Sequence, residues 1–287
     1  TPSVFRIGGT DGLRVTFYGV RGSTPCHGDD TRRYGGNTSC VVVDAPGELP
    51  LILDVGTGLR YFARTLPHSQ PVKVNVLLSH LHWDHIQGLP FFVPLLHDTT
   101  HVHVVAPRQE GVSVGEAIRR SITPPTFPVE IDALAATITY ADAGDETFSV
   151  GGFEVTSRFV PHVGPTLGFR IRWNDKVIVY IPDHQQPEDG SVEFTEGAME
   201  LMRDADLLIH DAQYLPEEFA RRSNWGHCTT EFAVQGARRA HVKHLALFHH
   251  DPSRNDDTLD RIHDTLDAET GKSIRLSTAR EGMVLEV

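Results

Sequence analysis

The sequence has few cysteines, no long apolar run and a deficit of basic residues, and each shortage excludes a class of protein. Cys26, Cys40 and Cys228 form no closely spaced pair, so we expect reduced thiols and no disulfide framework. Because Cys228 adjoins a histidine discussed below, a role as ligand or nucleophile stays open, although a bystander thiol is favoured. No apolar run is long enough to cross a bilayer, and the chain starts without a secretion signal. We therefore expect a cytoplasmic protein with no membrane partner.

Acidic residues outnumber basic ones, with 38 Asp and Glu against 26 Lys and Arg, for a net charge of −12. Binding along a phosphate backbone relies on basic surface, so we expect no large nucleic acid as a partner. A small phosphorylated substrate is compatible with this charge, because metal ions could neutralise it. The 287 residues contain no internal repeat, linker or low-complexity tract, and 39% are apolar. We predict one domain over residues 1–287.

The most informative stretch begins where an apolar run ends at Ser79. His80, His82, Asp84 and His85 follow within six positions. In extended backbone, residues two apart point to the same side, so the first two histidines can bind one ion together. The aspartate and the third histidine then face a second position. These ligand types suit zinc, with manganese as an alternative, and two nearby ions would form a hydrolytic site. A histidine-rich surface loop is disfavoured by the H-x-H-x-D-H order directly after a buried strand.

The segment from His80 to His85 resembles the signature of the metallo-β-lactamase superfamily. The sequence from about Val15 to His249 is most similar to its phosphodiesterase branch, which includes tRNase Z, the cyclic phosphodiesterase of the phosphonate pathway and cyclic-nucleotide phosphodiesterases. The resemblance implies an α/β fold, the αββα sandwich, in which two mixed β-sheets pack face to face with helices outside. It also implies a homodimer. The motif is specific for the fold and the metal site, and much less so for the substrate.

The same resemblance implies a ligand set for two zinc ions per chain. The first ion is assigned to His80, His82, His162 and Asp183, and the second to Asp84, His85, His249 and Asp183. His250 is the alternative to His249, one position away. His184 is read as a neighbour of the bridging Asp183 and not as a ligand.

Further residues are assigned by resemblance to catalysis and to support of the ligands. Asp84 counts as catalytic as well as a ligand. His227 is expected to protonate the leaving group, and Asp211 to hold it, in a position where tRNase Z-like sequences have glutamate. Asp54 is expected to orient a ligand histidine from behind, and also to cap a helix over Leu59–Leu66.

Three residues are expected to border the substrate. Asn37 and Thr38 belong to the segment Gly36–Ser39, which matches a motif beside the active site in this branch. Phe127 lies in the proline-rich stretch Thr123–Pro128, which reads as a loop because proline is excluded from helix interiors and central strands. This loop either walls the substrate pocket or is a plain connector.

Periodicity and turn signals predict the remaining elements. Strands are expected at 13–20, 41–43, 51–53, 73–79, 102–106, 147–159, 167–173, 176–181, 206–209 and 244–248, with the first three antiparallel. Helices are expected at 59–66, around 86–96, and at 116–121, 231–240 and 256–270. Residues 274–287 are expected to form a closing hairpin.

These observations favour a zinc-dependent phosphodiesterase that opens a cyclic nucleotide to its monophosphate. tRNase Z enzymes insert a long arm between the third ligand motif and the bridging aspartate, whereas here one tight hairpin fills the 21 positions from His162 to Asp183. Alternatives are a phosphoribosyl cyclic phosphate phosphodiesterase, an acyl hydrolase of the β-lactamase or thioesterase type, and a tRNA 3′-processing nuclease. A metal-binding protein without catalysis is a further alternative.

Overall fold

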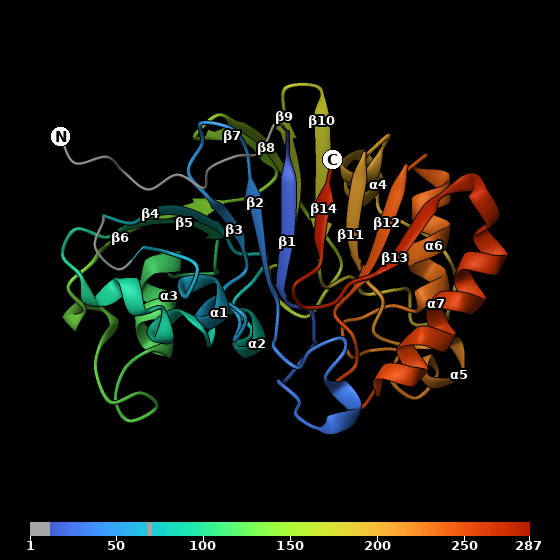
Figure 1. Ribbon diagram of the computed structural model, residues 1–287, viewed down its shortest axis with the longest axis horizontal. Coiled ribbons are helices and arrows are strands. Elements are labelled where there is room, and N and C mark those ends of the chain that lie inside the picture. Colours follow the sequence, from blue (N-terminus) through green and yellow to red (C-terminus); the bar gives the residue numbers. More distant parts are fainter. Residues whose placement is uncertain (1–11, 68–70) are drawn as a thin grey trace.

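Two seven-stranded β-sheets form the centre of the structure (Figure 1), a computed structural model that describes residues 12–67 and 71–287. The start of the chain, on which the expectation of no secretion signal rests, lies outside the described residues. The first sheet has the order β14 (Val284–Glu286), β1 (Arg14–Gly19), β2 (Cys40–Asp44), β3 (Leu51–Leu53), β4 (Lys73–Leu77), β5 (His101–Pro107), β6 (Thr137–Ala143). The second sheet has the order β13 (Arg275–Thr278), β12 (His244–Phe248), β11 (Leu207–Asp211), β10 (Lys176–Ile181), β9 (Leu167–Trp173), β8 (Phe153–Phe159), β7 (Glu146–Val150).

Each sheet is mixed, and the two follow the same plan. In the first sheet, β14, β1, β2 and β3 pair antiparallel, and β3 to β6 pair parallel. In the second sheet, β7 to β10 pair antiparallel, and β10 to β13 pair parallel. The predicted antiparallel start of the chain is confirmed. Because carboxyl ends of parallel strands share one edge of a sheet, the segments after β10, β11 and β12 emerge together.

The facing surfaces of the two sheets form the central core. Val15 and Phe17 of β1 alternate with half-buried residues and point inward, where they meet residues of the second sheet such as Phe169 and Phe248. The rings of Phe17 and Phe248 lie 6.1 Å apart. Side chains that alternate across a pleated strand thus let each sheet bury one face against the other sheet and one against helices.

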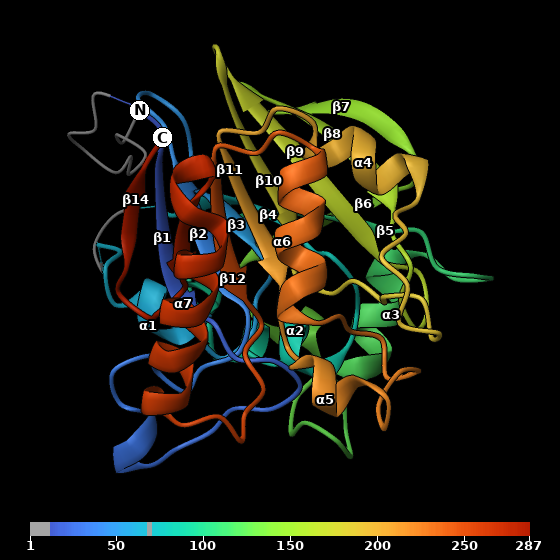
Figure 2. The ribbon, with the colours of Figure 1, turned by 90° about the vertical axis from the view of Figure 1, so that its right-hand side faces the viewer.

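Helices cover the outer face of each sheet, which confirms the predicted αββα sandwich. The first sheet carries α1 (Leu59–Ala63), α2 (Trp83–Ile86) and α3 (Val114–Ser121), and the second carries α4 (Glu196–Met202), α6 (Thr230–Arg239) and α7 (Asp256–Thr270). The one-turn helix α5 (Pro216–Phe219) lies in the loop between β11 and α6. Figure 2 shows α6 and α7 in front of the strands they cover. Within the described ranges, no helix is long and apolar enough to span a membrane.

Three element predictions are wrong. The helix expected around 86–96 is replaced by the end of α2 and two 3-10 turns, Leu89–Phe91 and Val93–Leu96, each with a proline near its start. Proline lacks an N–H and disrupts a continuous helix. The closing hairpin does not form either, because β13 joins the second sheet and β14 crosses back to pair with β1 in the first. The strand expected over 147–159 is two antiparallel strands, β7 and β8, with a turn at residues 151 and 152. The strand β6 and the helices α4 and α5 had not been predicted.

Candidate metal centre

Seven predicted metal-binding side chains converge at one edge of the sandwich, because each follows the end of a strand or lies beside one. His80, His82, Asp84 and His85 follow β4, His162 follows β8, Asp183 follows β10, and His249 follows β12. All are buried except His82, which is exposed, and His162, which is half-buried. The two sheets therefore each supply part of the donor set.

One group of donors consists of His80, His82 and His162, whose nitrogen atoms lie within 4.8 Å of one another. The Nε2 atom of His162 lies 3.2 Å from Nδ1 of His82. The Oδ2 atom of Asp183 lies 3.7 Å from Nε2 of His80 and 3.6 Å from Nε2 of His162. This is the set assigned from the sequence to the first ion.

A second group consists of Asp84, His85 and His249, and two overlapping groups join Asp183 to these sets, one with His80 and His85 and one with His227 and His249. The Oδ2 atom of Asp84 lies 3.1 Å from Nε2 of His85 and 3.2 Å from Nε2 of His249. The Oδ1 atom of Asp183 lies 3.1 Å and 3.3 Å from the same two nitrogens. Asp183 therefore turns one oxygen toward each group, as a bridging carboxylate would.

The spacing of these donors fits metal ions of zinc type. Ligand atoms at the corners of a tetrahedron around zinc, with bonds of about 2.0–2.1 Å, are about 3.3 Å apart. The separations of 3.2 Å within the pairs His162–His82 and His85–His249 match that edge. Nε2 of His80 is buried and has no hydrogen-bond partner among the described residues, as expected of a nitrogen reserved for a metal.

Four ligand histidines are oriented by a hydrogen bond from the ring nitrogen that faces away from the centre, and for His80 the partner of Nδ1 is Oγ of Ser79 at 3.0 Å. Nδ1 of His85 donates to Oδ2 of Asp54 at 2.7 Å, and Nδ1 of His162 donates to the backbone carbonyl of Gly226 at 2.6 Å. Nδ1 of His249 donates to Oε1 of Gln213 at 2.8 Å. Each bond leaves the lone pair of Nε2 directed at the other donors. Gln213 was missed, because the sequence gives no signal beyond its place two residues after Asp211.

Asp54 lies behind the metal centre, where it accepts more hydrogen bonds than the sequence suggested. Besides the imidazole of His85, its carboxylate accepts from N and Oγ of Ser79 and from the hydroxyl of Tyr180, at 2.7 to 2.8 Å. The predicted helix-capping role of Asp54 is wrong, because the residue before α1 is Gly58 and no side chain caps it. The φ angle of Asp54 is 58°, a left-handed conformation that costs about 1–3 kcal/mol and is typical of functional sites.

Burial and neighbouring charges set the protonation of the ligands. Burial lowers the pKa of His80, His82 and His162, so their imidazoles stay neutral and able to coordinate. Burial alone would raise the pKa of Asp183, but His249 and His85 hold it well below its usual range. The same two histidines outweigh burial at Asp84 and keep the pKa of that carboxyl low. Burial would lower the pKa of His85, but Asp84 and Asp183 outweigh it and raise the pKa. Because neutral imidazoles and ionised carboxylates are the forms that bind metal, an ion bound here must displace the proton of His85.

His227 and Asp211 form a pair at the border of the centre, as the resemblance implied. Nδ1 of His227 donates to Oδ2 of Asp211 at 3.0 Å, and the imidazole also lies 3.7 Å from Asp183. The carboxylate of Asp211 is fixed by the backbone N–H groups of His184 and Gln213, both at 3.0 Å. Burial would lower the pKa of His227, but the adjacent Asp211 outweighs it and raises the pKa.

The neighbours that the sequence left open lie outside the donor groups. Nε2 of His250 donates to the carbonyl of Ala279 at 2.8 Å, so the geometry favours His249 as the donor. His184 is buried and hydrogen-bonds to His210 at 2.9 Å. The thiol of Cys228 is buried and donates to the backbone carbonyl of Asp211 at 3.2 Å, in keeping with a structural role.

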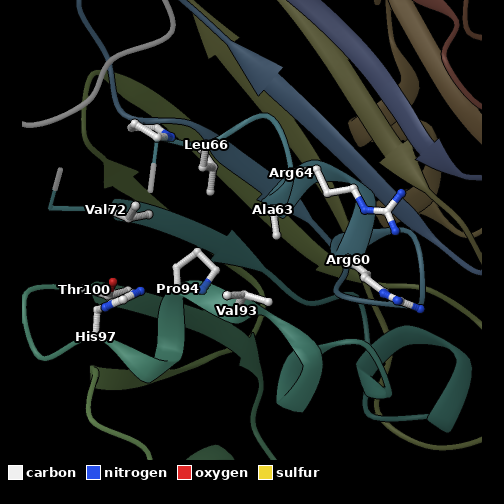
Figure 3. A pocket seen from close by; sticks show the side chains of 10 residues that line it. Arg60, Ala63, Arg64, Leu66, Val72, Val93, Pro94, His97 and Thr100 are labelled. Carbon is white, nitrogen blue, oxygen red and sulfur yellow. The ribbon is translucent and has the colours of Figure 1, made fainter. Parts of the chain in front are cut away.

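Two of the three residues expected to border the substrate line a cavity beside the centre. Asn37 and Phe127 are in its wall. Thr38 is fully buried, and its hydroxyl accepts from N of Thr57 at 2.9 Å, so the structure places it behind the cavity wall. A separate pocket of about 210 Å³ lies farther along α1 (Figure 3). It has arginines at one end and His97 at the other, and it contains none of the candidate ligands.

Comparison with known proteins agrees with this geometry. The model of the β-lactamase superfamily domain matches residues 51–250. The ribonuclease Z of Haloarcula marismortui is 25% identical over 306 residues, covering 90% of this chain and 93% of that protein. The metallo-β-lactamase fold protein YhfI from Bacillus subtilis superposes with a TM-score of 0.72 at 20% identity. The superposition covers 97% of this chain and 100% of the YhfI chain. A diphosphatase from the PhnP family superposes with a TM-score of 0.69 at 18% identity. The superposition covers 96% of this chain and 98% of the diphosphatase chain.

The expectation that no large nucleic acid is a partner is wrong. Curated relatives that match along most of the chain are named ribonuclease Z, and RNA is the substrate of a ribonuclease. The expectation rested on the net charge of −12, which sums over the whole surface. A net charge does not report the local potential around a site that holds metal ions.

Proposed function

Because the chain belongs to the β-lactamase superfamily and to its phosphodiesterase branch, we propose that it hydrolyses a small phosphodiester, with a cyclic nucleotide opened to its monophosphate as the first candidate. At the coarser level, the relatives and the histidine and aspartate clusters support a metal-dependent phosphodiesterase or nuclease. The observation that carries the proposal is a His227–Asp211 pair beside a donor set for two ions.

The ions would be held by the two groups of donors that share Asp183. Zinc is the proposed metal, with manganese as an alternative, because imidazole nitrogens dominate the set. When bound, the ions would supply Lewis acidity toward the phosphoryl oxygens and lower the pKa of the attacking water. Asp54 would keep His85 in the coordinating tautomer through its bond of 2.7 Å.

The residue proposed as general acid is His227. Its Nδ1 donates to the carboxyl of Asp211 at 3.0 Å, a contact that favours the protonated imidazole, which is the form that can give a proton to the departing oxygen. Asp211 would hold the ring in place and stabilise its positive charge. Because Asp211 is itself fixed by two backbone N–H groups, the imidazole would need little rearrangement during the reaction.

The short connection between β8 and β10 supports a small substrate. After His162 the chain forms β9, turns at Asn174 and Asp175, and returns as β10 to Asp183. The arm that the family's tRNA-processing members use has no counterpart in this interval. The proposal also includes a homodimer located in the cytoplasm, which rests on resemblance and composition.

A second candidate is RNA 3′-end processing, which the names of the curated relatives favour. The same donors and the same acid would serve, because the bond cleaved is again a phosphodiester. The two candidates differ in what must fit beside the centre.

Turnover of a substrate panel by the purified, metal-loaded protein tests the proposal. The panel contains cyclic mononucleotides, the cyclic phosphodiester of ribose, a precursor tRNA with a 3′ trailer, bis-p-nitrophenyl phosphate and a β-lactam. We expect hydrolysis of at least one cyclic nucleotide and of the chromogenic diester. Cleavage of the precursor alone would replace the first candidate with the second, and hydrolysis of the β-lactam alone would overturn both. Light scattering of the same sample would measure the oligomeric state.

A further inference from the structure

A cavity of about 480 Å³ lies beside the candidate metal centre, and the proposed chemistry does not use it. Trp83 and Gln87 line it, and both belong to the turn of α2, where N of Gln87 donates to the carbonyl of Trp83 at 2.8 Å. The same turn carries Asp84 and His85, which point into the centre. A group that fills the cavity would therefore contact the same helical turn that carries two of the metal donors.

Aromatic side chains form much of the wall. Trp83 is 56% exposed and Phe91 is 58% exposed, which is high for large apolar side chains in a concave surface. Phe127 packs edge to face on Phe91, with ring centres 5.8 Å apart and an angle of 88° between the planes. Exposed ring faces of this kind are suited to stack on a flat heteroaromatic ring.

Two amide oxygens in the wall are free to accept hydrogen bonds. Nδ2 of Asn37 donates to both carboxylate oxygens of Glu281 at 3.0 Å, so the amide nitrogen faces Glu281 and Oδ1 faces away from it. Nε2 of Gln87 donates to Oγ1 of Thr38 at 3.4 Å, which turns Oε1 the other way. Among the described residues, neither amide oxygen has a donor. A ligand that brings N–H groups would satisfy both.

We propose that this cavity binds the nucleobase of the substrate, and that it favours a base with an exocyclic amino group, such as adenine. The inference rests on the proposed function, because a nucleotide is the small phosphodiester that carries a flat ring next to its phosphate. Trp83 and Phe127 stack on the base, and the amide oxygens of Asn37 and Gln87 accept from its amino group. Arg60, at the cavity edge, adds positive charge for the anionic substrate.

Binding of nucleosides, which have no phosphate to hydrolyse, tests the cavity separately from catalysis. Adenosine added to the metal-loaded protein should quench tryptophan fluorescence with saturation. Purine riboside, which lacks only the amino group, should bind about 3- to 10-fold more weakly. Trp83→Phe should abolish the quenching. Trp225→Phe is the matched control, because Trp225 is 59% exposed but lies outside the cavity, and it should leave the quenching intact.

Kinetics supply the second measurement. Phe127→Ala should raise the KM for a cyclic adenine nucleotide about 5- to 100-fold, which is what loss of one base stack costs. The same variant should lower kcat/KM for cyclic glycerol phosphate, a diester without a base, much less than for the nucleotide. Circular dichroism would verify that the variant is folded.

The outcomes separate this inference from the proposed function. Saturable adenosine binding without turnover of any phosphodiester would keep the base site and overturn the proposed function. Phosphodiester turnover without nucleoside quenching, and with an unchanged KM in Phe127→Ala, would overturn the base site and keep the function.

Discussion

Individual atoms decide the chemistry of this site, and the ring nitrogens of His227 are the clearest case. With Nδ1 bonded to Asp211 at 3.0 Å, only Nε2 can serve a substrate. General acid catalysis contributes about 10²–10⁴ in rate, so His227→Ala should lower kcat by that amount on an alkoxide leaving group. The loss should be smaller for p-nitrophenolate, which needs no proton to leave.

Metal content is the control for this variant. If His227 is the acid, elemental analysis of His227→Ala should show as much metal as in the unchanged protein. Loss of an ion would instead make His227 a ligand, as its distance of 3.7 Å from Asp183 would then suggest.

The absence of a side chain at Gly22 leaves room for the imidazole of His249 and the amide of Gln213. A Cβ atom added there would lie 2.4 Å from Nδ1 of His249 and 2.4 Å from Oε1 of Gln213, far inside contact distance. Gly22→Ala should therefore displace the imidazole or its hydrogen bond, and lower both metal content and turnover. Gly144→Ala is the matched control, since its Cβ would meet nothing closer than 3.7 Å. Full metal content and activity in Gly22→Ala would contradict the placement of His249.

At the scale of elements, the sequence predicts metal ligands well where several lie in one short segment, and poorly where a segment contributes only one. The four donors from His80 to His85 follow one apolar strand, so local pattern and ligand chemistry agree. His162, Asp183 and His249 are lone residues after separate strands, and only resemblance selects them, because the fold that brings them together is a long-range property.

Local pattern also fails where pairing partners are distant. The strand β6, Thr137–Ala143, is exposed or half-buried over most of its length and carries little hydrophobic signal. Residues 274–287 have strand-like composition, but composition cannot reveal that β13 and β14 join different sheets. The tertiary environment, rather than local propensity, decides such assignments.

The pairing of β1 with β2 places a carboxylate where its charge is costly. Asp44 is buried, with Arg14 at 3.5 Å, and burial raises its pKa to about 6. Between about pH 4 and pH 6, the carboxyl of Asp44 is therefore protonated in the folded state. In the unfolded chain, where the pKa of an aspartate is near 3.9, it has already lost its proton. Stability from Asp44 is present at about pH 4 and is lost as pH rises through about 6, by roughly 3 kcal/mol.

Replacement by an uncharged side chain should remove this loss. Asp44→Asn should raise Tm at pH 7.5, and the gain should disappear near pH 4. Asp206 is the matched control with the opposite sign: burial would raise its pKa, but its bond of 2.7 Å to Lys243 and other favourable contacts lower it. Asp206→Asn should lower Tm at neutral pH, and the loss should fade as pH falls through the pKa of that carboxyl. No gain from Asp44→Asn at pH 7.5 would show that Arg14 fully compensates the burial.

For the whole molecule, metal binding and stability should be linked, because the donors come from both sheets. We expect two ions per chain by elemental analysis. At a free metal concentration 100 times Kd, each ion adds about 2.7 kcal/mol to the free energy of unfolding, so two ions add about 5 kcal/mol. Chelation should then lower Tm by roughly 10 °C in a chain of this size. An unchanged Tm after complete metal removal would mean that the ions bind the folded chain no more tightly than the unfolded chain at that concentration.

The connection between β6 of the first sheet and β7 of the second is short. β6 ends at Ala143 and β7 begins at Glu146, so the chain leaves one sheet and enters the other within two residues. Cleavage there would divide the molecule into two fragments, one with the four donors that follow β4 and one with His162, Asp183 and His249. The second fragment would also carry β14, the strand that returns to the first sheet. Co-expressed as a split protein, the fragments should reassemble, and zinc should strengthen their association because neither fragment can complete a coordination shell alone.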